Sequence, residues 1–439
     1  MAKKVVDFIA RIKESRLFKD SFWAVYGNGL GYGLLLVSGI IIARLLGNEI
    51  YGEYGLVKTT MFLMASFAAF GLNYTATKYI AEAVKTNRAY VKGYAKNALT
   101  ITTASSMTVA AAIVIFSGPL ADFLNAPGLK GSFQLLGGLI VLRSLIYTLA
   151  AILAGFGAFK TIARNNVISG LIMLAACYPF TVRWGLTGAF AALVLSQVCN
   201  AAANYISYAG YCKNLPPQQK HGSRKEMMFF SLPIALQEVS YAICSWVGAL
   251  LITRLSTLGE LGIYSATAQW NAVILFIPTV LINVVLAHLS KEKTEQAHVQ
   301  IIKRVLLVNF VCAFVPFVIV YALAGFITSL YGSSFAGMNA VLRVFTLATV
   351  FSCCSKVLYT ELISLGKTWF AFSTRLLQDV FLVAAGVCLI MYTSLPASLA
   401  YAAATVLAAA LYFGILLCSV WRYHKSKIAV DNAAERQKT

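Results

Sequence analysis

Charged residues are scarce in this sequence. They make up 12% of the 439 residues, against 59% hydrophobic residues, and the mean hydropathy is +0.75. Acidic residues are the scarcest, with 16 Asp and Glu against 36 Lys and Arg and a net charge of +20. A chain of this kind cannot cover a water-facing surface with polar side chains, so the composition excludes an ordinary soluble domain.

Patterns that bind metal ions are also lacking. The nine cysteines lie in or beside apolar runs and form no CxxC pair, and the four histidines fall in or beside polar loops. Buried free cysteine behaves as a small hydrophobic residue. We therefore expect no metal site, no cofactor and no histidine proton relay inside a membrane.

Apolar runs of about 20 residues dominate the chain, and each is long enough to cross a bilayer as a helix. They predict an all-α membrane protein with about twelve transmembrane helices. The expected spans are 22–43, 54–73, 97–117, 132–154, 162–181, 185–208, 227–252, 262–288, 303–326, 338–364, 370–392 and 396–420.

Basic residues are distributed unequally between the two sides of these spans. With the N-terminus in the cytoplasm, 27 of the 36 Lys and Arg fall in cytoplasmic segments and four, Arg44, Lys130, Arg183 and Arg254, in outer loops. This is the positive-inside asymmetry of membrane proteins. The excess of basic residues therefore mainly reflects the membrane topology. It predicts cytoplasmic N- and C-termini and no nucleic-acid partner.

The stretch 44–82 is repeated 210 residues later. Without a gap, Arg44, Leu45, Gly52, Tyr54, Asn73 and Glu82 match Arg254, Leu255, Gly262, Tyr264, Asn283 and Glu292. Such repeats are typical of transporters built from two similar halves. With six spans each, both halves enter the membrane from the same side, so a pseudo-two-fold axis along the membrane normal should relate them.

The longest polar connection, 209–226, is the expected boundary between the halves. The sequence predicts a cytoplasmic amphipathic segment over 1–21 and an N-terminal six-helix lobe over 22–208. A cytoplasmic inter-lobe loop over 209–226, a C-terminal six-helix lobe over 227–420 and a cytoplasmic tail over 421–439 follow.

Several charged side chains lie inside these spans, where a charge at the bilayer centre costs at least roughly 2.5–3.5 kcal/mol and should face protein or water. Arg143 and Glu238 lie near the midplane, and for Arg143 a cavity-facing role is favoured over a private salt bridge with Glu238. Lys58 and Arg343 lie near the outer ends of their spans, where a snorkelling role stays open. A cationic path between two lobes suits an anionic substrate, because Arg and Lys hold phosphate through charge-assisted hydrogen bonds.

The tenth and eleventh spans carry the other intramembrane charges. Lys356 and Asp379 lie at similar depths in the membrane and are expected to pair, as are Glu361 and Arg375. Arg375 and Asp379 also share a helix face at i, i+4. Two interpretations stay open: a structural charge clamp, or a proton- or sodium-responsive gate. These four residues and Glu238 are therefore the candidates for coupling or gating.

Several segments carry a family resemblance: ARLLGNEIYGEYGL and KYIAE at the first hairpin, FFSLPIAL at 229–236, RLSTLGELGIYSATAQW at 254–270 and LYGSSFAGMNAVLRVFTLATVF at 330–351. Together they resemble the Wzx-type oligosaccharide-lipid flippases of the multidrug/oligosaccharidyl-lipid/polysaccharide exporter (MOP) superfamily. The resemblance covers nearly the whole chain and implies a V-shaped pair of six-helix lobes.

The implied activity is alternating-access carriage of undecaprenyl-diphosphate-linked oligosaccharide from the inner to the outer leaflet of a bacterial inner membrane. It would serve O-antigen, capsule or exopolysaccharide biosynthesis, with membrane lipids, a polysaccharide polymerase and a chain-length regulator as partners. Cationic cavity residues are typical of the family, and Arg44, Lys58, Arg143, Arg343 and Arg254 are the positions that can serve. A proton or a sodium gradient stays open as the energy source.

The sequence lacks features that three alternative classes of protein carry. Cation-coupled drug exporters of the superfamily carry an acid in the first span, and none lies between Phe22 and Ala43; a multidrug/cation antiporter is the alternative that we keep. The G-x3-D-R-x-G-R-R-like loop of major-facilitator carriers is absent after the second span. A polymerase or ligase would display catalytic groups on a large outer loop, and the longest here has about 14 residues, so we expect no enzyme.

Overall fold

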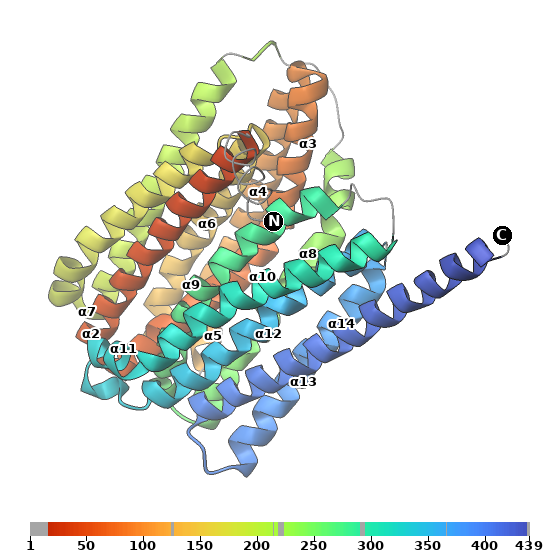
Figure 1. Ribbon diagram of the computed structural model, residues 1–439. Coiled ribbons are helices and arrows are strands. Elements are labelled where there is room, and N and C mark those ends of the chain that lie inside the picture. The colour runs from red at the N-terminus through yellow and green to blue at the C-terminus, as the bar shows by residue number, and fades with distance from the viewer. Residues whose placement is uncertain are drawn as a thin grey trace. The chain divides into compact units, whose positions relative to one another are not determined.

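The computed structural model describes residues 16–123, 127–213, 215–217, 224–289, 295–365 and 367–436 (Figure 1). The regular structure of these residues is all helical. The expected amphipathic segment lies outside the described residues as far as residue 15, as do residues 214 and 218–223 of the expected inter-lobe loop. The chain divides into two compact units, Met1–Arg254 and Leu255–Thr439.

The first unit contains seven α-helices and two 3-10 turns among its described residues. They are α2 (Arg16–Ala69), α3 (Leu72–Thr86), η1 (Arg88–Tyr90), α4 (Val91–Ile115), α5 (Ser117–Phe123), η2 (Pro127–Leu129), α6 (Lys130–Gly155), α7 (Phe159–Lys213) and α8 (Arg224–Leu255). The helices α2 and α7 lie side by side, and α6 packs against both (Figure 1).

Glycines divide the two longest helices into pairs of crossings. Gly47 (φ 74°, ψ 170°) interrupts α2 and Gly185 (φ 55°, ψ −131°) interrupts α7, in conformations that are essentially open to glycine alone. In α7 the two arms run back along each other, because Ser169 and Ser196 hydrogen-bond at 2.8 Å and Asn165 donates to Asn204 at 3.0 Å.

The number of crossings agrees with the sequence. In the described part of the chain, nine helical segments are long and apolar enough to span a membrane, and two of these hold the glycine breaks. The 32-residue helix α9 (Leu258–Leu289) adds a further crossing. The all-α fold with about twelve transmembrane helices is therefore confirmed.

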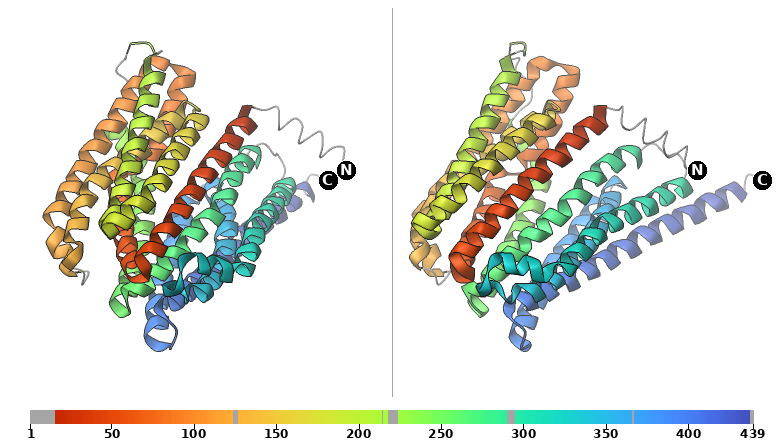
Figure 2. Two further views of the ribbon diagram at one scale, coloured as in Figure 1. Left: turned by 90° about the vertical axis from the view of Figure 1, so that its left-hand side faces the viewer. Right: turned by 60° about the vertical axis from the view of Figure 1, so that its left-hand side comes forward.

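The second unit holds α9, α10 (Glu295–Ala322), α11 (Ala324–Tyr331), η3 (Ser333–Phe335), α12 (Met338–Ser364), α13 (Thr368–Tyr392) and α14 (Ala397–Arg436). Within it, α14 packs against both α12 and α13 (Figure 2). The C-terminal span continues as a helix into the segment expected to be a tail, which begins at residue 421.

The two units share a plan that matches the sequence repeat. In each, a short helix and a 3-10 turn precede a long span: α5 and η2 before α6, and α11 and η3 before α12. The repeated tyrosines also make the same kind of contact, since Tyr54 packs on Phe190 at 5.0 Å between ring centroids and Tyr264 packs on Tyr401 at 5.4 Å.

The predicted second span, 54–73, is interrupted near its end. Phe70 (φ 48°) and Gly71 (φ 65°) adopt left-handed conformations, so α2 stops at Ala69 and α3 begins at Leu72. A positive φ is unusual for a bulky side chain such as phenylalanine. The sequence pattern missed this break because the apolar character continues through it.

Candidate functional site

Arg143 lies in the middle of α6, where its side chain is half-buried. Its guanidinium donates a 2.7 Å hydrogen bond to the Tyr147 hydroxyl, one helical turn further on. It also lies 4.6 Å from the centroid of the Tyr147 ring, within the range of a cation–π interaction. A single tyrosine on the same face of α6 thus orients the Arg143 guanidinium.

A second cation, Lys58, approaches Arg143 from α2. Its ammonium lies 5.2 Å from the centroid of the Tyr54 ring, and it is close enough to Arg143 for the two charges to repel each other. Tyr32, from the first arm of α2, interacts electrostatically with Arg143 and Tyr147. Lys58, Arg143, Tyr32, Tyr54 and Tyr147 form what we call the cationic cluster.

No carboxylate neutralises the cationic cluster within the part of the chain that the structure describes. Neither Lys58 nor Arg143 has an ion-pair partner there. Arg143 contacts the hydroxyl and ring of Tyr147, and Lys58 contacts the ring of Tyr54. Glu238, the proposed salt-bridge partner of Arg143, accepts a hydrogen bond from Asn73 Nδ2 at 3.1 Å. The midplane salt bridge is therefore not formed among the described residues.

Asn73 is a site residue whose role the sequence did not reveal. It is part of the 44–82 repeat, and it lies in the first turn of α3, two residues after the left-handed Gly71. Its amide connects α3 to α8 through Glu238. The repeat was the available signal, but it carried no information about the partner.

The other predicted phosphate-binding residues lie elsewhere. Arg44 is exposed near the Gly47 break, and the exposed Arg254 places its guanidinium 5.1 Å from the ring centroid of Phe123. Arg343, in the second unit, lies in the same way over Tyr321 at 5.1 Å. Of the five candidates, the structure brings together Lys58 and Arg143.

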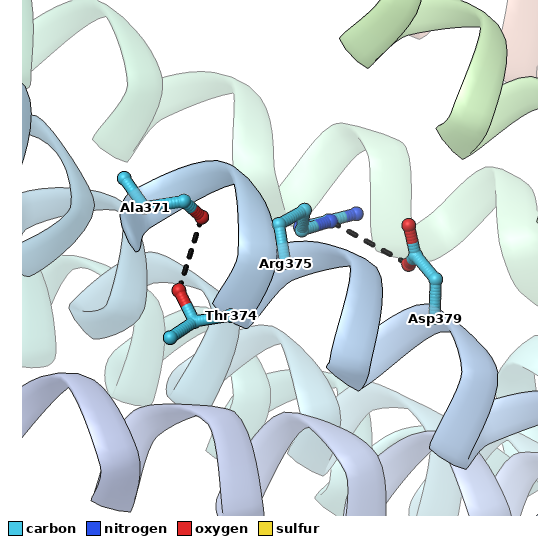
Figure 3. Close-up of polar contacts among 4 residues, drawn as sticks. All are labelled: Ala371, Thr374, Arg375 and Asp379. Carbon is cyan, nitrogen blue, oxygen red and sulfur yellow. Dashed lines mark hydrogen bonds and ion pairs between the residues drawn. The ribbon is translucent and has the colours of Figure 1, made fainter. Parts of the chain in front are cut away.

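The charged side chains of α13 form one of the expected close pairs. Arg375 Nε lies 3.5 Å from Asp379 Oδ1, with side chains 30% and 4% exposed (Figure 3). Thr374, next to Arg375, donates to the backbone carbonyl of Ala371 at 3.0 Å (Figure 3). The second carboxylate oxygen of Asp379 is buried without a hydrogen-bond partner among the described residues.

Two features of this region differ from the predicted clamp. Lys356, predicted to pair with Asp379, is exposed, and Asp379 pairs with Arg375 because the i, i+4 spacing brings them together on one helix. Glu361 lies 3.4 Å from His424 Nε2, and both side chains are 4% exposed. This contact connects α12 to α14, and the sequence does not predict it because His424 falls in the segment expected to be a cytoplasmic tail.

A family model described as polysaccharide biosynthesis protein matches residues 17–287. Several solved structures are similar over most of their length. An inward-facing multidrug resistance MATE family transporter of the MOP superfamily has a TM-score of 0.73 at 16% identity, over 90% of this chain and 96% of that one. A MOP superfamily transporter from Pyrococcus furiosus has a TM-score of 0.57 at 15% identity, over 91% and 94%.

The MATE transporter ClbM, in complex with Rb+, has a TM-score of 0.61 at 16% identity, over 94% of this chain and 98% of that one. At identities this low, these matches show similarity of fold alone. No sequence match was found among functionally curated proteins.

Proposed function

Because this chain is a multi-pass membrane protein that belongs to the polysaccharide biosynthesis protein family and has the fold of MOP superfamily transporters, we propose that it is a flippase for lipid-linked oligosaccharides. In this proposal it carries undecaprenyl-diphosphate-linked repeat units from the inner to the outer leaflet of the bacterial inner membrane by alternating access. The product would feed O-antigen, capsule or exopolysaccharide biosynthesis through a polymerase and a chain-length regulator.

The observation that carries this proposal is the cationic cluster. Two cations inside spans, without a carboxylate between them among the described residues, are unfavourable unless water or an anion compensates for them. A diphosphate carries enough negative charge to neutralise both. The planar guanidinium of Arg143 can bind two phosphate oxygens at once, while the Lys58 ammonium acts as a point charge.

The tyrosines of the cluster support the same assignment. Tyr147 already holds the guanidinium at 2.7 Å, so little ordering of this side chain is needed when an anion binds. Phenolic hydroxyls are further hydrogen-bond donors for phosphate oxygens or for the first sugar. A site of this kind selects the linker that all such substrates share, and so tolerates different sugars.

The orientation follows the basic asymmetry of the sequence. We place both termini and the loop at 209–226 in the cytoplasm. The substrate then enters from the leaflet in which it is assembled, and the diphosphate crosses the membrane beside α2 and α6.

The buried charges of the second unit suit a coupling role. Asp379 and Glu361 are acids held in an apolar environment, each beside a basic partner, Arg375 or His424. We assign these residues, with Lys356 and Glu238, to coupling by a proton or a sodium gradient. The alternative, a multidrug/cation antiporter, is favoured by the MATE-like fold but disfavoured by the cationic cluster, which repels cationic drugs.

Replacement of Arg143 tests the proposal. Arg143→Ala should reduce export of the polysaccharide at least about tenfold at a normal protein level, because a charged hydrogen bond contributes roughly 1.5–3 kcal/mol. Arg143→Lys should keep part of the activity. The matched control is Arg183→Ala, at an exposed arginine of α7 outside the cluster. Surface polysaccharide and membrane protein level are measured together, and normal export by a well-expressed Arg143→Ala protein contradicts the assignment.

A further inference from the structure

A pocket of about 480 Å³ lies at one end of the first unit, and nothing in the proposed transport cycle uses it. Its lining comes from the end of α3, η1, the residue after α6, both ends of α7 and Leu215, which follows α7. These are the points at which four membrane-spanning segments begin or end, so the pocket lies at the boundary between membrane and water. Phe156 borders it about 20 Å along the helix axis from Arg143, given the rise of 1.5 Å per residue.

The charged residues that line the pocket are basic. Arg88 and Arg164 are its charged residues, and no acidic side chain is among the residues that line it, all of which are described. A third cation, Lys92, donates to the Leu215 carbonyl at 3.0 Å and so fixes one wall. Two arginines that line one pocket are well suited to a phosphate group, whose oxygens accept paired hydrogen bonds.

The back of the pocket is held by a buried polar network. Asn165, only 1% exposed, donates to Asn204 Oδ1 at 3.0 Å and to Ser207 Oγ at 3.2 Å, and Ser207 donates to the Ala203 carbonyl at 2.8 Å. Beside it, the rings of Phe156 and Tyr211 stack at 5.3 Å. The Ser207 hydroxyl is thus already engaged as a donor, and the walls are formed before any ligand arrives.

Apart from the hydroxyls of Thr161, Ser207 and Tyr211, the remaining lining is apolar, and it continues onto exposed residues of α7. Ile206 lines the pocket and is 70% exposed, and its neighbour Tyr205 is 59% exposed on the same stretch of α7. In a membrane protein, exposed apolar side chains of a spanning helix face lipid. Contact with such a wall does not stabilise a bound soluble anion, whereas it buries apolar surface of the glycerol and acyl portion of a lipid.

We propose that this pocket binds the phosphate headgroup of an anionic membrane lipid in the adjacent leaflet. Arg88 and Arg164 hold the phosphate, and Ile206 with the apolar lining contacts the start of the acyl chains. The site does not depend on the proposed transport function, since it is formed by other residues than the cationic cluster.

Native mass spectrometry of the full-length protein in detergent tests this site. Phosphatidylglycerol, phosphatidylcholine and inorganic phosphate are the three probes. The wild type should retain phosphatidylglycerol in preference to phosphatidylcholine, and millimolar inorganic phosphate should not displace it. Arg88→Gln with Arg164→Gln should lose about tenfold or more of the retained lipid per arginine, and Arg88→Lys with Arg164→Lys should keep part of it.

The matched control is Lys130→Gln with Arg183→Gln, which removes two exposed cations from other parts of the same unit and should change nothing. Equal lipid loss in the control and in the double variant overturns the proposal, as does equal retention of the two lipids. Displacement by inorganic phosphate overturns the lipid assignment and leaves a site for a free anion. If the double variant does not fold, the single substitutions decide in the same way.

Discussion

The Arg375–Asp379 pair allows a quantitative prediction, because its two members are buried to different extents. The carboxylate of Asp379 is 4% exposed, whereas the Arg375 side chain is 30% exposed and can reach its surroundings. Arg375→Gln therefore leaves a buried anion without its ion-pair partner, while Asp379→Asn leaves a cation that can reorient. We expect Arg375→Gln to be the more destabilising of the two changes.

The magnitude follows from the 3.5 Å separation of Arg375 Nε and Asp379 Oδ1. With an effective dielectric constant of about 20, two unit charges at this distance attract by about 5 kcal/mol. Desolvation offsets much of this, but removal of one partner of a buried pair still costs roughly 3–5 kcal/mol. We expect about 3 kcal/mol for Arg375→Gln, and about 1 kcal/mol for Asp379→Asn because the Arg375 side chain that remains is partly exposed. The double variant should be more stable than Arg375→Gln alone.

Thermal unfolding of the purified protein in detergent measures these differences. From highest to lowest, the expected order of melting temperatures is wild type, Asp379→Asn, double variant and Arg375→Gln, with several degrees between the highest and the lowest. Arg422→Gln is the control, because Arg422 is an exposed arginine of α14. An equal loss of melting temperature in Asp379→Asn and Arg375→Gln contradicts this expectation, as does a double variant that is as unstable as the worse single change.

Two further predictions concern backbone and topology. Gly185→Ala should destabilise the protein by roughly 1–3 kcal/mol, because the backbone of Gly185 (φ 55°, ψ −131°) is strained for any residue with a side chain. Gly138→Ala, with open space inside the regular helix α6, should be neutral or slightly stabilising. A melting temperature of Gly185→Ala at or above that of Gly138→Ala contradicts this. On a cysteine-free background, a membrane-impermeant thiol reagent should label a cysteine at Ser333 and miss one at Ser223 in intact cells. The reverse pattern contradicts the proposed orientation.

Much of the fold follows from the sequence because hydropathy and glycine act locally. A run of about 20 apolar residues has few alternatives to a transmembrane helix, and a glycine such as Gly185 marks the point at which two spans meet. The repeat could be recognised for a similar reason. Tyr54 and Tyr264 occupy equivalent contacts in the two units, against Phe190 and Tyr401. The family resemblance and the twelve-helix fold were both predicted correctly.

The partners of individual charges followed from the sequence only where they lie on one helix. The i, i+4 spacing identified Arg375 with Asp379, and it places Tyr147 one turn from Arg143. Contacts between helices depend on rotation and register, which packing decides. The hydrogen bond between Asn73 and Glu238 joins residues that are 165 positions apart, and no spacing rule predicts it.

Glu361 with His424 was missed for a different reason. His424 was assigned to the cytoplasmic tail, whereas α14 continues to Arg436 and keeps this imidazole buried against α12. The tail residues are not apolar enough to predict a longer span, but a helix that leaves the membrane can continue beyond its apolar part. A charged pair near the end of a span therefore cannot be assigned from hydropathy alone.

We propose that Lys58 and Arg143 together bind the diphosphate of the substrate. The most direct test is the affinity of the purified protein for undecaprenyl diphosphate relative to undecaprenyl monophosphate. The wild type should prefer the diphosphate, and both Lys58→Met and Arg143→Gln should lose most of this preference, while Arg183→Gln keeps it. An unchanged preference in folded Lys58→Met and Arg143→Gln proteins would contradict the claim.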